Sequence, residues 1–205
     1  MKVAFQGERG AYSEVALRNY FSEKVEAVGF ELSEEVTEAL LNKEVAMAIL
    51  PVENSIVGNV NVNLDLIYKH PLFAIGEVYQ PIHHHLMVVP GTKLEDIKHV
   101  YSHPIALAQC RDFINKHGMK AVADYDTAGS CKLLKERESQ SSLRTEAAIG
   151  SVLCAETYGL EILSDKIQHT QNNITRFLVL VREEEIPEGI IQTKTSIAFS
   201  SSLLK

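Results

Sequence analysis

Residues 172–181, NNITRFLVLV, decide how this chain is organised. The apolar run predicts a strand over residues 174–181, and its start carries a hydroxyl, a guanidinium and an aromatic ring, with two amides just before it. A strand fixes such side chains better than a loop does, so its start suits a small polar site. Because Thr-Arg-Phe is also an ordinary beginning for a strand, other segments must separate these two interpretations.

Strand-like and helix-like patterns alternate before this stretch, which is typical of an α/β protein. Residues 45–50, VAMAIL, are nearly all apolar, as in a central parallel strand covered on both faces, and Pro51 is expected to end that strand. The first series has expected strands over 2–6, 25–30, 45–50 and 72–78, with expected helices over 11–21 and 33–41.

A second α/β series follows an expected crossover at residues 79–81, before the strand over 174–181 returns. Its expected strands cover 86–89, 99–102, 121–123 and 147–149, and its expected helices cover 104–117, 127–137 and 151–158. The order predicts two α/β lobes with a central cleft: a discontinuous first lobe over 1–78 plus 170–182 and a second over 79–169. Ligands of open parallel sheets bind where strands end and helices begin, so we expect the site in this cleft.

Composition limits the function classes. The 205 residues are 45% hydrophobic and 23% charged, as in an ordinary globular protein with a sizeable core. A net charge of -7 and a pI near 5.6 argue against a surface for duplex nucleic acid, which needs a basic stripe. The first seven residues turn polar too early for a secretory signal, and no apolar stretch reaches about 18 residues. A cytoplasmic protein without membrane partners is therefore expected.

The cysteines and the histidine run are expected to be structural. Cys110, Cys131 and Cys154 are odd in number and have no C-x-x-C spacing, which indicates reduced core thiols rather than a disulfide framework, a zinc site or a catalytic thiol. Residues 83–85, HHH, lie in a strand-like pattern in which neighbouring side chains point to opposite faces. They are expected to be strand or cleft-edge histidines rather than metal ligands.

Four polar segments fall where a strand ends or a helix begins, and each has a plain structural alternative. Residues 7–13, GERGAYS, either hold an anion with helix-opening amides or form a turn. Residues 51–58, PVENSIVG, gather a carboxylate, an amide and a hydroxyl, or form a capped turn. Residues 101–104, YSHP, and 124–129, DYDTAG, open helices and cap them. Together the segments indicate a small-anion site built from hydroxyls and amides, without a nucleotide loop.

In their order along the chain, these segments resemble the catalytic domain of the prephenate dehydratase family. The resemblance covers about residues 1–182 and is strong only when its motifs are taken together. The matching residues are Gly7, 10–13, 51–55, Gly58, 65–66, 102–104, 109–110, 126–128, 147–149, 158–160 and 173–177.

The resemblance implies a type II periplasmic-binding-protein-like fold, no metal and no organic cofactor. It implies that Thr175 is the principal catalytic residue and that Glu53, Asn54, Ser102 and Gln109 contribute to the site. Arg176 alternates with Thr175 along a strand, so its side chain is expected to face away although it could pair with a carboxylate. Whether the Phe177 ring touches substrate or packs beneath the site is left open. The further residues expected to bind substrate are Ala11, Tyr12, Ser13, Ser55, Thr127, Ala128, Arg176 and Phe177.

The resemblance also bears on partners. Family members usually continue into a regulatory ACT domain that binds phenylalanine, and residues 194–200, KTSIAFS, resemble its first strand. Residues 183–205 are therefore expected to be a linker and the start of a truncated ACT-like domain, with phenylalanine an effector only where the whole domain is present. The other expected partners are prephenate as substrate and further copies of the chain, as a dimer or tetramer.

Two other functions stay open at this point. Arogenate dehydratases differ only in accepting an amine in place of the side-chain ketone of prephenate. A non-catalytic small-anion-binding protein would use the same two-lobed architecture, since fold alone does not define function.

Overall fold

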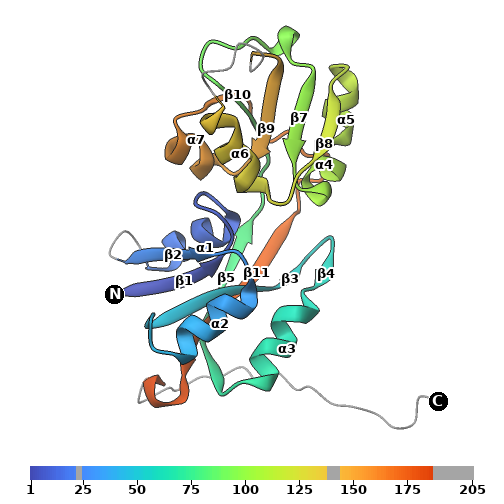
Figure 1. The fold of residues 1–205 in the computed structure, drawn as a ribbon. Helices are drawn as coiled ribbons and strands as arrows, with labels where there is room; N and C mark the ends of the chain where they lie inside the picture. Colours follow the sequence, from blue (N-terminus) through green and yellow to red (C-terminus); the bar gives the residue numbers. More distant parts are fainter. Residues whose placement is uncertain (22–24, 138–143, 187–205) are drawn as a thin grey trace, which may run out of the picture.

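The computed structural model describes residues 1–21, 25–137 and 144–186, which form two sheets with flanking helices (Figure 1). The first sheet has the strand order β2-β1-β3-β11-β5, and β4 pairs with β3. Its strands are β1 Lys2–Gln6, β2 Glu26–Phe30, β3 Met47–Asn54, β4 Gly58–Asn59, β5 Leu72–Pro81 and β11 Ile174–Arg182. Its helices are α1 Tyr12–Phe21, α2 Ser33–Leu41 and α3 Asn61–Lys69.

The second sheet has the order β10-β6-β9-β7-β8. Its strands are β6 His85–Val88, β7 His99–Ser102, β8 Lys120–Ala123, β9 Glu146–Gly150 and β10 Glu161–Ser164. Its helices are α4 Pro104–Gln109, α5 Arg111–Lys116, α6 Thr127–Glu136 and α7 Val152–Tyr158. Single 3₁₀ turns cover Leu94–Asp96 and Glu183–Glu185. The predicted fold class, two α/β lobes around a cleft, is confirmed; we call the part built on the six-stranded sheet the first lobe and the other part the second lobe.

Helices cover both faces of the first sheet, as its apolar strands require. Val3 and Phe5 belong to an apolar cluster with Leu17 of α1, whereas Ala4 between them belongs to another with Leu40 of α2. Side chains alternate along a strand, so an almost continuous apolar strand buries both of its sides. In β3, Ile49 belongs to the first cluster and Ala48 and Leu50 belong to the second, and the strand lies between β1 and β11. The central position expected for residues 45–50 is therefore confirmed, although β3 is parallel to β1 and antiparallel to β11.

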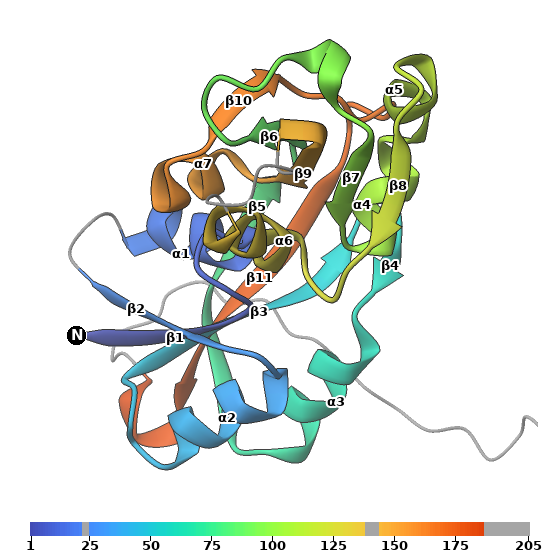
Figure 2. The same cartoon turned by 45° about the horizontal axis from the view of Figure 1, so that its top comes forward.

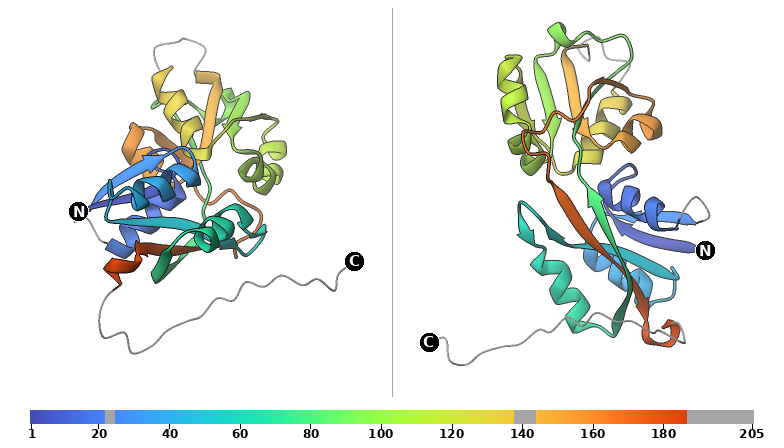
Figure 3. Two further views of the ribbon diagram at one scale, coloured as in Figure 1. Left: turned by 60° about the horizontal axis from the view of Figure 1, so that its bottom comes forward. Right: turned by 180° about the vertical axis from the view of Figure 1, so that it is seen from behind.

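Strands β5 and β11 carry the chain between the lobes. They pair antiparallel from Leu72 with Arg182 to Pro81 with Ile174 and run side by side toward the second sheet (Figure 3). The pairing continues just past the strands, where the Ile82 N–H donates to the Asn173 carbonyl at 2.8 Å. The two connections between the lobes therefore lie next to each other.

Several expected boundaries were wrong. Pro51 does not end β3, which continues to Asn54, because the pairing with β11 shifts by one residue there and the bulge accommodates a residue without an N–H. Strand β5 extends through the expected crossover to Pro81, and His83 and His84 of the histidine run lie outside β6, which begins at His85. The expected helix over 104–117 is two short helices that meet at Cys110. Helix α3 and strands β4 and β10 were not predicted.

The burial expected for the three cysteines is confirmed. Cys131 and Cys154 lie in the apolar cluster that also contains Phe5 and Leu17, so this cluster joins the two lobes. None of the helices in the described parts of the chain is long and apolar enough to cross a membrane. The expected ACT-like strand at 194–200 lies outside the described residues.

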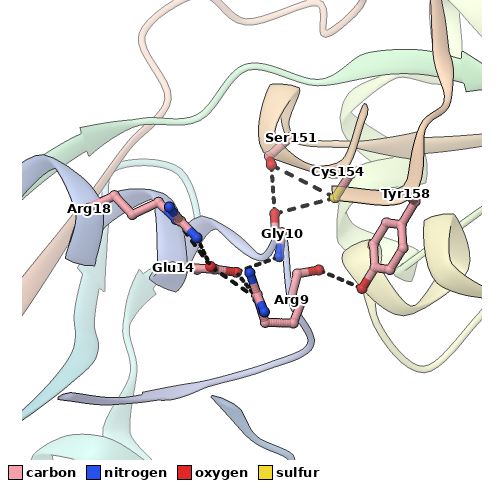
Figure 4. Close-up of polar contacts among 7 residues, drawn as sticks. All are labelled: Arg9, Gly10, Glu14, Arg18, Ser151, Cys154 and Tyr158. Atoms are coloured by element: carbon pink, nitrogen blue, oxygen red, sulfur yellow. Dashed lines mark hydrogen bonds and ion pairs between the residues drawn. The ribbon is translucent and has the colours of Figure 1, made fainter. Parts of the chain in front are cut away.

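A polar clasp also joins the lobes, where the loop between β1 and α1 meets α7 (Figures 2 and 4). The Gly10 carbonyl accepts hydrogen bonds from Ser151 Oγ at 2.6 Å and from Cys154 Sγ at 3.3 Å. The Tyr158 hydroxyl donates to the Arg9 carbonyl at 2.7 Å. These contacts fix the backbone of the first lobe against one helix of the second.

Glu14 holds this loop from the α1 side. Its carboxylate is fully buried and accepts hydrogen bonds from the Gly10 N–H at 2.7 Å, from Arg9 Nε at 3.2 Å and from Arg18 Nη2 at 2.7 Å (Figure 4). A buried charge is tolerated only when it is paired and hydrogen-bonded, and Glu14 meets both conditions. The loop between β1 and α1, which supplies the first-lobe side of the clasp, is therefore held in place by Glu14.

Gly10 should be the most sensitive point of the clasp. Its φ is +88°, and an added Cβ would lie 2.8 Å from Cys154 Sγ and 3.1 Å from the Cys154 Cα. We expect Gly10→Ala to lower the free energy of unfolding by about 2–5 kcal/mol, since it combines an unfavourable backbone conformation with overpacking. Urea unfolding followed by circular dichroism measures this loss.

Gly118→Ala is the matched control, because Gly118 has a φ of +66° and an added Cβ would meet nothing within 4 Å. That variant should lose only the backbone contribution, about 1–2 kcal/mol. Equal losses in the two variants would show that the contact with Cys154 does not constrain the lobes.

Candidate active site

A cavity of about 280 Å³ lies between the lobes, just below the range of about 300–1,000 Å³ that is usual for small-molecule sites. It adjoins a hollow of about 720 Å³ that shares Gln6, Gly7, His103 and Asp126 with it. The described residues that line the cavity are Gln6, Gly7, Ala11, Tyr12, Ser13, Pro51, Asn54, Val57, Gly58, Val60, Ile82, His84, His103, Ile105, Ala106, Gln109, Asp126, Thr127, Asn173, Thr175 and Phe177.

One wall is the end of the β3–β11 pair, where Thr175 lies opposite Asn54. The Asn54 amide donates from Nδ2 to Thr175 Oγ1 at 2.9 Å and to Asn173 Oδ1 at 2.8 Å. Its Oδ1 accepts from the N–H groups of Ile56 and Val57, both at 2.9 Å. The turn after β3 thus fixes the amide that contacts the Thr175 hydroxyl.

Glu53 and Arg176 are the next pair in the register, and neither lines the cavity. The Arg176 guanidinium lies 2.9 Å from the Glu77 carboxylate and 3.9 Å from that of Glu53, and it stacks over the Tyr79 ring. Side chains alternate between the faces of a strand, so an inward Thr175 turns its neighbour outward. In this arrangement Arg176 is engaged in a surface ion-pair cluster.

The adjoining part of the wall contains Gln109 and His84. Gln109 Oε1 lies 2.7 Å from His84 Nε2 and accepts from Asn173 Nδ2 at 3.0 Å. His84 Nδ1 lies 2.9 Å from the Tyr12 hydroxyl, which also donates to the His83 carbonyl at 2.6 Å. Polar side chains from α1, α4 and both connections between the lobes therefore meet in one network.

Burial sets the protonation states in this wall. It lowers the pKa of His84 to about 4, with further lowering by His85 and His83, while the hydrogen bond to Gln109 opposes the shift. Burial also raises the pKa of Tyr12 well above its usual value. At neutral pH the imidazole is uncharged and the phenol keeps its proton.

The other expected site residues divide into two groups. Ala11, Tyr12, Ser13, Thr127 and Phe177 line the cavity, and the Phe177 ring is also part of the apolar cluster beneath it. Ala128 is fully buried and does not line the cavity.

Two expected hydroxyls also lie outside the cavity wall. The Ser102 hydroxyl is buried and donates to the Ile149 carbonyl at 2.9 Å, which ties the end of β7 to β9. The Ser55 hydroxyl donates to the Asn172 carbonyl at 2.9 Å and accepts from the Ile174 N–H at 3.0 Å. Both hold backbone segments that lead to the cavity.

Sequence reasoning missed His84, and it did not place Asn173, His103 or Asp126 among the site residues. The expectation of a cleft-edge histidine was the available signal, but three adjacent histidines do not show which one faces the cleft. The neighbouring His85 instead pairs with Asp165 away from the cavity. Across the described ranges, no group of three or more His, Cys, Asp or Glu side chains is placed to hold a metal ion.

Comparisons with known proteins identify relatives of the whole described chain. A family model described as prephenate dehydratase matches residues 3–185. "Arogenate dehydratase/prephenate dehydratase 1, chloroplastic" of Arabidopsis thaliana is 43% identical over 202 residues, which cover 98% of this chain and 50% of that protein. "Arogenate dehydratase 2" of Petunia hybrida is 42% identical, with the same coverage. The chain spans about half the length of these two relatives.

Solved structures give the same result for the fold. Prephenate dehydratase from Arthrobacter aurescens, solved in complex with L-Phe, superposes with a TM-score of 0.80 at 29% identity, covering 95% of this chain and 63% of that one. A structure described as GqqA, a novel type of quorum quenching acylase, also gives 0.80, at 32% identity over 89% of this chain and 64% of that one.

Burial of His84 should make the protein sensitive to acid. Its pKa is lower in the fold, about 4, than in the unfolded chain, about 6.5, so the unfolded state binds more protons between these values. Stability should therefore fall as the pH drops from 6.5 to 4, and the His84 contribution to this loss should be about 3 kcal/mol.

His84→Gln isolates this contribution from those of His83 and His85. Urea unfolding of the wild type and the variant at a series of pH values between 7 and 4 measures it. The wild type should lose stability more steeply than the variant, and parallel pH dependences would contradict the lowered pKa.

Proposed function

Because the chain belongs to the prephenate dehydratase family, we propose that it is a carbon–oxygen lyase that converts prephenate to phenylpyruvate, with loss of water and carbon dioxide. The observation that carries this proposal is the Thr175 hydroxyl in the cavity wall, with Asn54 already donating to its oxygen. The hydroxyl proton is thereby left for a group in the cavity. No hydrogen bond donated by this hydroxyl is found among the described residues.

The reaction requires help for a leaving hydroxyl group. The bond from the ring to its carboxylate breaks, its electron pair enters the ring, and the ring hydroxyl leaves with a proton as water while the ring becomes aromatic. No base is needed. A threonine hydroxyl is a poor acid, so Thr175 donates a hydrogen bond to the departing oxygen or relays a proton, and stabilises the charge that develops there.

The substrate carboxylates require donors, and the cavity supplies neutral ones. The described residues that line it include no lysine or arginine. Helices α1 and α6 both begin at the cavity, with Ser13 and Thr127 in their first turns, and the N-terminal end of a helix carries partial positive charge. In α6 the Asp126 cap already accepts from the Gly129 N–H. We assign these two helix starts to carboxylate binding, together with Ala11, which precedes α1, and Tyr12, its first residue.

The remaining expected residues act from outside the cavity in this proposal. Glu53 and Arg176 fix the outer face of the β3–β11 pair, so that Asn54 and Thr175 stay aligned. Ser55, Ser102 and Ala128 support the backbone around the cavity, whereas Gln109 acts within it. Phe177 forms the apolar floor on which a ring can lie.

Arogenate is the second candidate substrate, because relatives at 42–43% identity carry arogenate dehydratase in their descriptions. Arogenate and prephenate share the ring and its leaving groups, so the same Thr175 chemistry applies to both. Parallel assays separate the two: phenylpyruvate absorbance reports prephenate turnover, and phenylalanine formation reports arogenate turnover. A protein that binds either acid but turns over neither would instead be a binding protein.

The cellular setting remains a prediction of the sequence. It comprises a cytoplasmic site of action, assembly into a dimer or tetramer, and control by phenylalanine where an ACT domain is present. An L-Phe complex is known for the relative from Arthrobacter aurescens. Initial rates with and without phenylalanine, combined with light scattering, test both regulation and assembly.

Replacing the Thr175 hydroxyl should affect turnover far more than binding. Thr175→Val keeps the shape and should lower kcat by about 10²–10³-fold, as the loss of one donor to a developing oxyanion does. KM should change little, since the hydroxyl acts mainly as the leaving group departs. Thr175→Ser keeps the hydroxyl and is the matched control, expected to retain kcat within about tenfold. Wild-type turnover in Thr175→Val would remove this residue from the mechanism.

A further inference from the structure

Four side chains form a continuous hydrogen-bonded chain along the cavity wall, which we call the amide chain: Asn54, Asn173, Gln109 and His84. It begins at Asn54, the last residue of β3, and its far end contacts Tyr12 of α1. Each amide has one end that donates and one that accepts, and a neutral imidazole carries its proton on one nitrogen. The direction of every bond in the chain is therefore linked to the direction of the others.

The first member is fixed by the backbone. Asn54 Oδ1 accepts from two N–H groups, those of Ile56 and Val57, which can only donate. An inverted Asn54 amide would place its NH₂ group against both donors. Asn54 must therefore donate from Nδ2 toward Asn173 and Thr175.

This direction is passed along the chain. Because Asn173 Oδ1 receives the proton from Asn54, its Nδ2 must donate, and it donates to Gln109 Oε1 at 3.0 Å. Gln109 Oε1 is then an acceptor on its other side as well, where His84 Nε2 lies at 2.7 Å. An unprotonated Nε2 would set two lone pairs against each other at that distance, so Nε2 carries the proton.

The Tyr12 end favours the opposite arrangement, but more weakly. With the proton on Nε2, both His84 Nδ1 and the His83 carbonyl accept from the single Tyr12 hydroxyl proton, at 2.9 and 2.6 Å. With the proton on Nδ1, the ring would donate to the Tyr12 oxygen, and the Tyr12 proton would go to the His83 carbonyl alone. An acceptor–acceptor or donor–donor contact would then arise elsewhere in the amide chain. A shared proton costs less than a buried repulsive contact of that kind.

We propose that His84 is a positioning residue, whose Nε2–H holds Gln109 so that the Gln109 Nε2 amide is presented to the cavity. Among the described residues, none accepts a hydrogen bond from this amide, and Gln109 lines the cavity. Asn54 and His84 thus act from opposite ends to give the cavity two donors, the Gln109 amide and the Thr175 hydroxyl.

The direction of the donors matters because of the charge of the ligand. The inference rests on the proposed function in one respect, namely that the substrate is an anion with two carboxylates. The only carboxylate among the described lining residues is that of Asp126, whose Oδ2 accepts from the Gly129 N–H at 3.1 Å as the cap of α6. Without a lysine or arginine in this wall, an inverted Gln109 would present a carbonyl oxygen to an anion, which is repulsive.

The tautomer can be measured without any assay of activity. Long-range ¹H–¹⁵N spectra of the ¹⁵N-histidine-labelled protein at pH 7, assigned by comparison with His84→Gln, report which ring nitrogen of His84 carries a proton. We expect a protonated Nε2. An unprotonated Nε2 would overturn the proposal, whatever the substrate is.

Kinetics then test whether His84 acts through Gln109. His84→Leu removes the donor at similar volume and should lower kcat/KM at least about tenfold, below the 10²–10³-fold loss typical of a direct donor. His84→Gln keeps an N–H donor near the Nε2 position and should retain kcat/KM within about fivefold, as expected when orientation rather than imidazole chemistry matters. In a Gln109→Leu background, His84→Leu should cause little further loss, because residues that act as a unit are not additive.

His85→Leu is the matched control, since His85 is an adjacent buried histidine that does not line the cavity. It should leave kcat/KM unchanged, although it loses its pairing with Asp165. Fully additive losses for His84 and Gln109, or equal losses in His84→Leu and His84→Gln, would overturn the positioning role. A wild-type protein inactive on both prephenate and arogenate would instead refute the proposed function, and the tautomer measurement would still decide the inference.

Discussion

The site depends on the insertion of β11 between β3 and β5. The pairing with β3 joins residues more than 120 positions apart and sets Thr175 opposite Asn54 in the first sheet. Strands β5 and β11 also lead to the connections between the lobes, so the cavity wall and these connections share one backbone scaffold. A strand held by neighbours on both sides has little freedom, which is what a positioned hydroxyl requires.

The described lining residues of the cavity include no lysine or arginine, yet such a wall can suit the anionic substrate proposed above. Charged side chains near the site are engaged elsewhere: Arg176 with Glu77 and Glu53, and Arg9 and Arg18 with Glu14. Apart from the Asp126 carboxylate that caps α6, the described polar groups toward the cavity are oriented dipoles, from amides, hydroxyls and helix starts. Oriented dipoles in a partly closed site stabilise developing charge without reorganising, and electrostatic catalysis of this kind is often the largest contribution.

The two lobes are held on one side of the cavity by the clasp at Gly10 and by the apolar cluster that contains Phe5 and Cys154. The paired connections form a second junction, at Ile82 and Asn173. Tyr12 and His84 form a further contact between the lobes, since the Tyr12 hydroxyl lies 2.9 Å from His84 Nδ1. The geometry of the amide chain is therefore coupled to how the lobes are packed.

The sequence by itself determined the α/β class, the two-lobed order and most strands and helices, because periodicity and apolar runs report local burial directly. It also predicted Thr175, Asn54 and Gln109 as site residues, because they belong to motifs at the beginning or end of these elements. It did not show that β3 passes through Pro51, because a bulge depends on the partner strand.

Only the tertiary structure separated the inward residues from the outward ones. The register turned Glu53 and Arg176 away from the cavity, while packing turned His84 of three adjacent histidines toward it. The physical reason is that a local pattern records which side chains are buried, whereas a site depends on which buried groups face one another across distant segments. The direction of each hydrogen bond in the amide chain was likewise decided by partners that are remote in sequence.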